Sequence, residues 1–162
     1  MLPIHIVGHA GCGKTTLIVD LVRELIKNRV KVGSLKHSAH AHELDKPGKD
    51  SFAHRAAGAA PVTMVTKEMS AVYLPRTKET NPENILKTFY SDVDIVLIEG
   101  WISGPFQKIE LFRKSLDRPP LFPEINNVKA VVTDDHIENL NDIQLFSRSD
   151  LDGIVRFILC FT

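Results

Sequence analysis

The chain has little of what marks a secreted, membrane-spanning or nucleic-acid-binding protein. Its 162 residues include two cysteines and one tryptophan, and 20 basic residues balance 20 acidic ones. Two cysteines make no disulfide framework, and a neutral chain lacks the basic excess that general binding to nucleic acid or anionic membranes requires. No apolar run approaches the ~20 residues that span a bilayer. Because the chain begins on a predicted core strand, we expect no signal peptide and a cytoplasmic location.

The most informative segment is residues 8–15, which read Gly-His-Ala-Gly-Cys-Gly-Lys-Thr. They match the phosphate-loop pattern G-x-x-x-x-G-K-[ST]. The apolar residues 2–7 before it predict a short buried strand. The residues behind it predict an amphipathic helix, because apolar side chains between Leu17 and Ile26 fall on one stripe. This order of strand, loop and helix predicts a site for a nucleoside triphosphate.

The residue types in this loop suit a bound phosphate chain. Glycines let successive backbone N–H groups point at one anion, and the helix dipole adds to that field. Lys14 can reach the terminal phosphates, and the Thr15 hydroxyl is placed to bind Mg²⁺. Cys12 is either a reactive thiol or simply a small residue at a permissive position. The predicted loop site comprises Gly8, His9, Ala10, Gly11, Cys12, Gly13, Lys14, Thr15 and Thr16.

A second nucleotide element is predicted at residues 94–100, where the apolar run 95–98 ends in Glu99 and Gly100. A wholly apolar run of this length is typical of a central parallel strand. A carboxylate at its carboxyl end would hold Mg²⁺ or position the attacking water, so we predict catalytic roles for Lys14 and Glu99 and metal binding by Thr15 and Glu99. Gly100 permits close approach of the backbone to the phosphates.

The base is less clearly specified. The guanine-reading motif Asn-Lys-x-Asp is absent, and the strand candidate 128–132 is followed by Asp134. This carboxylate could accept hydrogen bonds from guanine, or it could belong to a polar turn. Spacing alone does not choose GTP over ATP.

Strand-like and helix-like segments alternate along the chain, which predicts an α/β fold. We expect a single P-loop nucleotide-binding domain over residues 1–162, with three layers, a mostly parallel sheet and helices on both faces. Residues 108–113 alternate in polarity and predict an edge strand. Residues 128–132 are expected to be the last strand, and Cys160 is expected in the core. Further strands are predicted at 30–36, 61–66 and 71–74, and further helices at 51–57, 82–90 and 151–161.

The segment 36–58 is rich in basic and histidine side chains and leaves a predicted strand at its carboxyl end, which is the ligand edge of a doubly wound sheet. Its cations could meet beside the nucleotide and bind a second anionic ligand. A metal site and a solvated polar loop are the alternatives. The cations are Lys14, Lys36, Lys46, Lys49 and Arg55. The possible metal ligands are His37, His40, His42 and Asp45.

The chain resembles the family of molybdopterin-guanine dinucleotide biosynthesis protein B, MobB. The resemblance rests on four stretches, of which Asp-Lys-Pro-Gly-Lys-Asp-Ser is the most specific. They are residues 8–16, residues 36–37, residues 45–51 with 54–58, and residues 99–100 with 108–110.

The resemblance implies a small GTP-binding protein with weak GTPase activity that uses GTP and Mg²⁺. It further implies a homodimer that assists MobA, the guanylyltransferase joining GMP to molybdopterin. The family is thought to deliver GTP or to carry the pterin between proteins. The candidates for binding the anionic groups of molybdopterin are then Lys36, His37, Lys49, His54 and Arg55.

Two other functions remain open on the residues alone. A small-molecule kinase or ATP-dependent ligase could use loop 37–50 to hold an acceptor. Its lid would need several arginines, and the late candidates are few: Arg113, Lys114 and Arg118. A pure binding module with a structural nucleotide is the third possibility, and measured turnover would separate it from the others.

Overall fold

The protein is described by a computed structural model covering residues 1–38, 40–77, 81–138 and 142–161. The chain divides into two compact units. The first unit combines residues 1–38 with residues 90–162, and the second holds residues 39–89.

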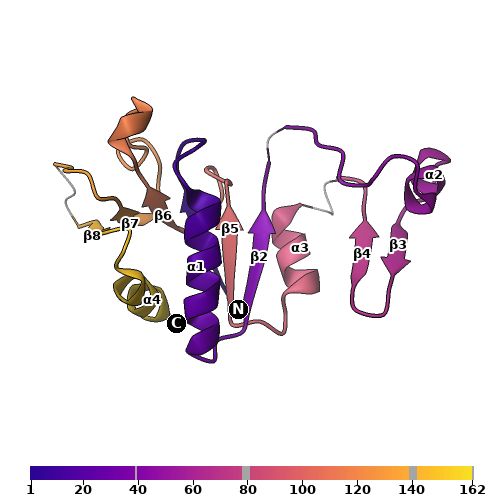
Figure 1. The fold of residues 1–162 in the computed structure, drawn as a ribbon, viewed down its shortest axis with the longest axis horizontal. Coiled ribbons are helices and arrows are strands. Elements are labelled where there is room, and N and C mark those ends of the chain that lie inside the picture. The colour runs from indigo at the N-terminus through magenta and orange to yellow at the C-terminus, as the bar shows by residue number, and fades with distance from the viewer. Residues whose placement is uncertain (39, 78–80, 139–141, 162) are drawn as a thin grey trace. The chain divides into compact units, whose positions relative to one another are not determined.

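The first unit is built on a parallel sheet, which has six strands in the described part of the chain (Figure 1). Their order is β2-β5-β1-β6-β7-β8, and every neighbouring pair is parallel. Strand β1, which leads into the phosphate loop, therefore lies between β5 and β6. The strands are Leu2–Val7 (β1), Val32–Lys36 (β2), Ile95–Glu99 (β5), Gln107–Leu111 (β6), Val128–Val132 (β7) and Gln144–Phe146 (β8).

Helices α1 (Lys14–Lys27) and α4 (Leu151–Leu159) pack on one face of this sheet (Figure 1). The apolar stripe predicted for the first helix is buried at Leu17, Ile18, Leu21 and Leu25, whereas Ile26 at its end is exposed. The buried part packs against alternate residues of four strands, as the strand period of two requires. This core includes Leu17, Leu21 and Leu25 from α1, Ile154 and Ile158 from α4, and Ile4, Ile6, Leu97, Ile109 and Val132 from the sheet.

The second unit contains α2 (Asp50–Ala56), β3 (Val62–Val65), β4 (Ser70–Tyr73) and α3 (Pro82–Phe89). Strands β3 and β4 form the antiparallel hairpin that the two neighbouring strand candidates predict. Helix α2 ends just before Gly58, whose φ of 99° is a backbone conformation that glycine adopts without strain. Helix α3 begins at its proline, where a missing N–H costs nothing.

Three expectations from the sequence are wrong. Strand β6 is interior rather than an edge, because its alternating charges Lys108 and Glu110 are buried beneath loops instead of facing solvent. Strand β7 is followed by β8, which has only three residues and is too short to show a period. Cys160 is exposed, because α4 buries Ile154, Val155 and Ile158 and ends before the cysteine.

Candidate functional site

The phosphate loop joins β1 to α1 and is pressed against the end of β6. Gly8, Gly11 and Gly13 all have positive φ, at 140°, 80° and 98°. A Cβ atom at Gly8 would lie only 2.3 Å from the carbonyl oxygen of Leu111, so no larger residue fits without moving the backbone. The close approach and the left-handed turns together give the loop the shape that directs amides at a phosphate.

Lys14 folds back over this loop. Its Nζ donates hydrogen bonds to the carbonyl oxygens of Gly8 at 2.9 Å and His9 at 2.8 Å. The ammonium group therefore lies within the curve of the loop, where it can meet a phosphate chain.

Glu99 is brought to the loop by the sheet order. The Thr15 hydroxyl donates to Glu99 Oε1 at 3.0 Å, although the two residues are 84 positions apart in sequence. The Lys36 Nζ lies 3.4 Å from the same oxygen, and the Glu99 side chain is only 14% exposed. A hydroxyl and a carboxylate side by side are the oxygen donors that Mg²⁺ takes from proteins.

Gly100 and His37 lie at the same edge of the sheet. Gly100 has a φ of 82°, and a Cβ there would approach the His37 carbonyl oxygen to 2.9 Å. The His37 N–H donates to the Glu99 carbonyl at 2.9 Å, and the His37 ring stacks on Trp101 with centroids 5.6 Å apart. The backbone that leaves β2 is thus fixed directly to the residues that follow β5.

The remaining loop residues differ in exposure. Cys12 is buried, so the small-residue reading suits it better than a reactive thiol. Ala10 and Thr16 are exposed. His9 turns outward, and its Nε2 lies 2.8 Å from the carbonyl oxygen of Pro119, which ties the phosphate loop to the loop after β6.

Asp134 follows β7 and borders a cavity of about 270 Å³. Its Oδ1 accepts hydrogen bonds from the Ser147 hydroxyl at 2.7 Å and the Arg148 amide at 2.9 Å. These bonds, chiefly the one from Ser147, hold the pKa of Asp134 below its usual range. In the described residues its Oδ2 accepts no hydrogen bond, so this ionised oxygen faces no competing donor there. Asp134 is therefore both a turn residue and a candidate acceptor.

Two arginines line the same cavity, and reasoning from the sequence did not connect either with the base. Arg113 follows β6, and Arg148 follows β8. Their positions in the sequence could have identified both arginines, because residues just beyond parallel strands lie together at the ligand edge of the sheet. Strand β8 escaped prediction, so Arg148 could not be placed at that edge.

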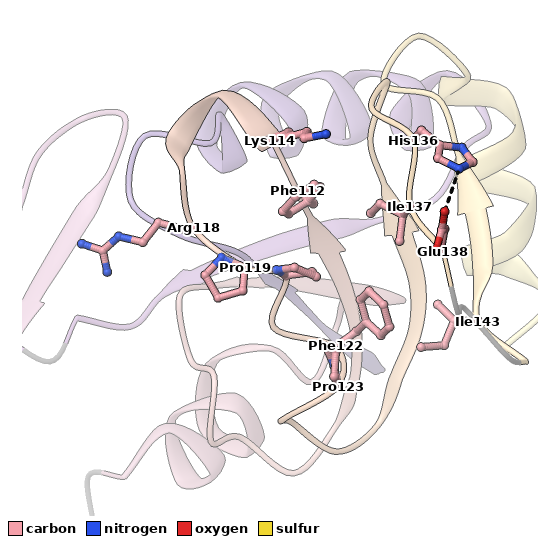
Figure 2. Close-up of a pocket in the computed structure, with 11 residues that line it drawn as sticks. Phe112, Lys114, Arg118, Pro119, Phe122, Pro123, His136, Ile137, Glu138 and Ile143 are labelled. Atoms are coloured by element: carbon pink, nitrogen blue, oxygen red, sulfur yellow. Dashed lines mark ion pairs between the residues drawn. The ribbon is translucent and has the colours of Figure 1, made fainter.

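A larger cavity of about 740 Å³ is drawn in Figure 2. Phe112 lines both this cavity and the smaller one. Phe112, Phe122 and Ile143 give it apolar walls, and the His136 and Glu138 side chains pair across 3.8 Å at its border. Arg118 lines it too, with its guanidinium extending away from the other labelled side chains (Figure 2).

The basic segment of the second unit is organised by ion pairs of its own. Arg55 pairs with Glu43 and lies 3.8 Å from Asp45, whose Oδ1 also accepts a hydrogen bond from Ser51. Lys49 and His54 are exposed. In the described part of the chain no group of three or more histidine, cysteine or acidic residues is arranged to hold a metal, so the metal alternative for this loop gains no support.

Beneath β6 the sheet carries a buried polar cluster that the sequence did not predict. His5 and Glu110 are fully buried, and Lys108 is nearly so. Lys108 donates to the Gly104 carbonyl at 2.7 Å, and Glu110 accepts from the amides of Leu121 and Phe122. Burial lowers the pKa of Lys108 and raises that of Glu110. These bonds attach two loops to the sheet.

The His5 imidazole should make stability depend on pH. Burial, together with the charges of Lys108 and His37, lowers the pKa of His5 from 6.5 to about 4. The unfolded chain therefore takes up a proton between pH 6.5 and 4 that the folded chain does not. Stability is fully present above pH 6.5 and falls as the pH drops through this window, by about 3 kcal/mol.

Urea unfolding at several pH values would measure this loss. In a His5→Gln variant, which keeps an acceptor for the Phe106 amide, the unfolding free energy should fall less steeply over the same window. Exposed His136→Gln serves as the control and should retain the steep fall. An unchanged slope in His5→Gln would assign the acid sensitivity to other groups.

The sheet order, the phosphate loop and the acidic residue beside it define an α/β protein with a P-loop NTPase-like fold. The family model for "Molybdopterin guanine dinucleotide synthesis protein B" (MobB) matches residues 3–134. The chain belongs to the MobB family, as the resemblance predicted.

Relatives and solved structures agree with this assignment. The chain is 36% identical over 83% of its length to the Haemophilus influenzae "Molybdopterin-guanine dinucleotide biosynthesis adapter protein", covering 76% of that protein. It is 31% identical over 93% of its length to the Escherichia coli protein of the same name, covering 87% of it.

The fold also matches crystal structures. One of molybdopterin-guanine biosynthesis protein B shares 25% identity, with a TM-score of 0.76 over 99% of this chain and 100% of that one. Bacillus subtilis MobB shares the fold, with a TM-score of 0.78 over 99% of this chain and 97% of that one at 22% identity. The predicted α/β P-loop fold with a mostly parallel sheet is confirmed. In the described residues, no helix is both long and apolar enough to cross a bilayer.

Proposed function

We propose that this chain is a GTP-binding adapter protein in molybdopterin guanine dinucleotide biosynthesis. Its relatives in two bacteria carry the adapter name, and the family model spans most of the chain. The observation that carries the nucleotide part is the contact between Thr15 and Glu99, which sets a hydroxyl and a carboxylate 3.0 Å apart beside a glycine-lined loop.

In this proposal the loop amides and Lys14 bind the β- and γ-phosphates of GTP. The Thr15 hydroxyl and the Glu99 carboxylate would hold Mg²⁺, whose charge offsets that of the phosphates when it is bound. Glu99 also orients the attacking water, and hydrolysis is weak. Because the His37 amide donates to the Glu99 carbonyl, a change at Glu99 reaches the start of loop 37–50.

The wider proposal concerns partners. The protein would act on a MobA-like guanylyltransferase, as a cytoplasmic homodimer, with residues 1–162 working as one nucleotide-binding domain. Lys36, His37, Lys49, His54 and Arg55 are proposed to bind the anionic groups of molybdopterin. The exposed Lys49 is the sharpest test of this idea. Its charge reversal should weaken retention of molybdopterin in equilibrium dialysis and leave GTP binding intact, and equal loss of both ligands would contradict a separate pterin site.

Calorimetric titration with GTP and with ATP, each with Mg²⁺, tests the proposed function directly. Tighter binding of GTP supports it. Tighter binding of ATP would favour the kinase or ligase alternative, with loop 37–50 as the acceptor site. Release of phosphate without a phosphorylated acceptor then separates hydrolysis from transfer.

Asp134→Asn should reduce the preference for GTP over ATP by about 10-fold. The asparagine carbonyl can still accept from Ser147 and the Arg148 amide, whereas the nitrogen that replaces Oδ2 donates instead of accepting. One lost hydrogen bond to a charged group is worth about 1.5–3 kcal/mol.

The measurement is the ratio of the two dissociation constants, with exposed Asp92→Asn as the control. If discrimination is undiminished in Asp134→Asn, the base is read elsewhere in the chain.

A further inference from the structure

The side chain of Arg113 lies against the phosphate loop. It follows β6, the strand next to β1, and so leaves the sheet at the edge where the loop begins. A Cβ atom added at Gly13 would lie 3.3 Å from Arg113 Nη2 and 3.8 Å from its Cζ. The guanidinium is therefore beside the residue that immediately precedes Lys14.

The same side chain borders the cavity of about 270 Å³ that contains Asp134 and Asp135. The positive charge of Arg113 contributes to the lowered pKa of Asp134, after the hydrogen bonds from Ser147 and Arg148. Arg113 thus lies between the loop that takes phosphates and the carboxylate proposed to read the base.

The two arginines of this cavity are held differently. Arg148 is 18% exposed, and its Nη2 contacts Asp20 of α1 at 3.4 Å. Arg113 is exposed, and within the described ranges of the chain its side chain makes no hydrogen bond or ion pair, although its backbone carbonyl accepts from the Leu116 amide. Arg148 therefore supports the wall of the cavity, whereas the Arg113 guanidinium keeps its donors available to a ligand.

We propose that Arg113 is a purine-binding residue, whose planar guanidinium stacks on the base of a bound nucleoside triphosphate. This inference rests on the proposed function. A base held at its edge by Asp134 needs a surface over its plane, and a guanidinium stacks on aromatic faces where an ammonium has no plane to offer. Because the chain lacks Asn-Lys-x-Asp, the contact with the plane of the base would come from Arg113, which follows β6. The contact with the edge of the base would come from Asp134, which follows β7.

Dissociation constants for GTP, ATP and inorganic triphosphate, measured on Arg113→Ala and Arg113→Lys, test the proposal. Arg113→Ala should bind both nucleotides about 10-fold more weakly, as expected for a lost cation–π contact, and bind inorganic triphosphate as the natural chain does. Arg113→Lys should stay well below the natural affinity, because it keeps the charge and loses the plane.

Arg118→Ala is the matched control, since it removes one exposed positive charge from the same connecting segment. It should leave GTP affinity unchanged. Unaltered GTP affinity in Arg113→Ala would overturn the inference. Equal losses for inorganic triphosphate and GTP, equal losses in Arg118→Ala, or full recovery in Arg113→Lys would also overturn it, because each points to charge alone.

The failure of the proposed function looks different. In that case the natural chain fails to bind GTP, or Lys14→Ala binds it normally. Thermal unfolding of each variant checks folding, and Arg113→Lys allows the test even if the alanine variant is unstable.

Discussion

Replacing Lys14 with alanine is expected to weaken GTP binding at least about 100-fold. The ammonium lies within the curve of the loop, and it would make charge-assisted hydrogen bonds that each contribute about 1.5–3 kcal/mol. The fold should survive, because the substitution removes side-chain hydrogen bonds to the carbonyls of Gly8 and His9 and leaves the apolar core of the sheet and α1 intact. We expect a stability loss of about 1 kcal/mol.

Calorimetry with GTP and Mg²⁺ measures the affinity, and urea unfolding measures the stability. The control is Lys27→Ala at the far end of the same helix, where the lysine pairs with Glu24 and is largely exposed. Normal GTP affinity in Lys14→Ala would remove the loop from the nucleotide site. A collapse of stability together with affinity would mean that Lys14 serves the loop rather than the ligand.

Replacing Glu99 with glutamine is expected to slow GTP hydrolysis about 100-fold with little change in GTP affinity. The amide oxygen can still accept from the Thr15 hydroxyl, so the local geometry persists. What is lost is the negative charge that we propose to orient water and to face Mg²⁺, and such acid–base roles contribute about 10²–10⁴-fold.

Phosphate release under single-turnover conditions reports the chemical step, and calorimetry reports binding. Glu24→Gln is a suitable control because its carboxylate is on α1 and pairs with Lys27 instead of facing the loop. A fully active Glu99→Gln would exclude Glu99 from the mechanism. If affinity falls as much as the rate, Glu99 acts through the bound metal in the ground state.

The elements that could be predicted are those whose signal is local. The phosphate loop, the strand before it and the helix behind it follow from glycines, periodicity and one motif within residues 2–27. Pro82 and Gly58 mark a helix start and a helix end for equally local reasons.

The wrong expectation for β6 has a clear physical cause. Lys108 and Glu110 alternate with apolar residues and so resemble the solvent face of an edge strand. Both are buried, because loops that arrive from distant positions supply carbonyl and amide partners to them. The polarity pattern of a strand shows which side chains need hydrogen-bond partners. It does not show whether water or a distant loop supplies those partners.

The candidate site shows the same division. Its residue types could be chosen from the sequence, since glycines, lysine, threonine and acidic residues each suit one part of a nucleotide. The sequence could not show whether Arg55 is available to a ligand, because its ion pairs with Glu43 and Asp45 form only in the folded unit. The place of Arg113 beside Gly13 likewise depends on β6 lying next to β1.

The sequence by itself determined the phosphate loop, the α/β class and membership of the MobB family, because these are written in short motifs and in local periodicity. Only the tertiary structure decided that Thr15 meets Glu99, that His5 lies among buried charges, and that Arg113 and Asp134 border one cavity. Those contacts depend on the order of strands in the sheet, and that order is set by the burial of whole faces rather than by any one segment.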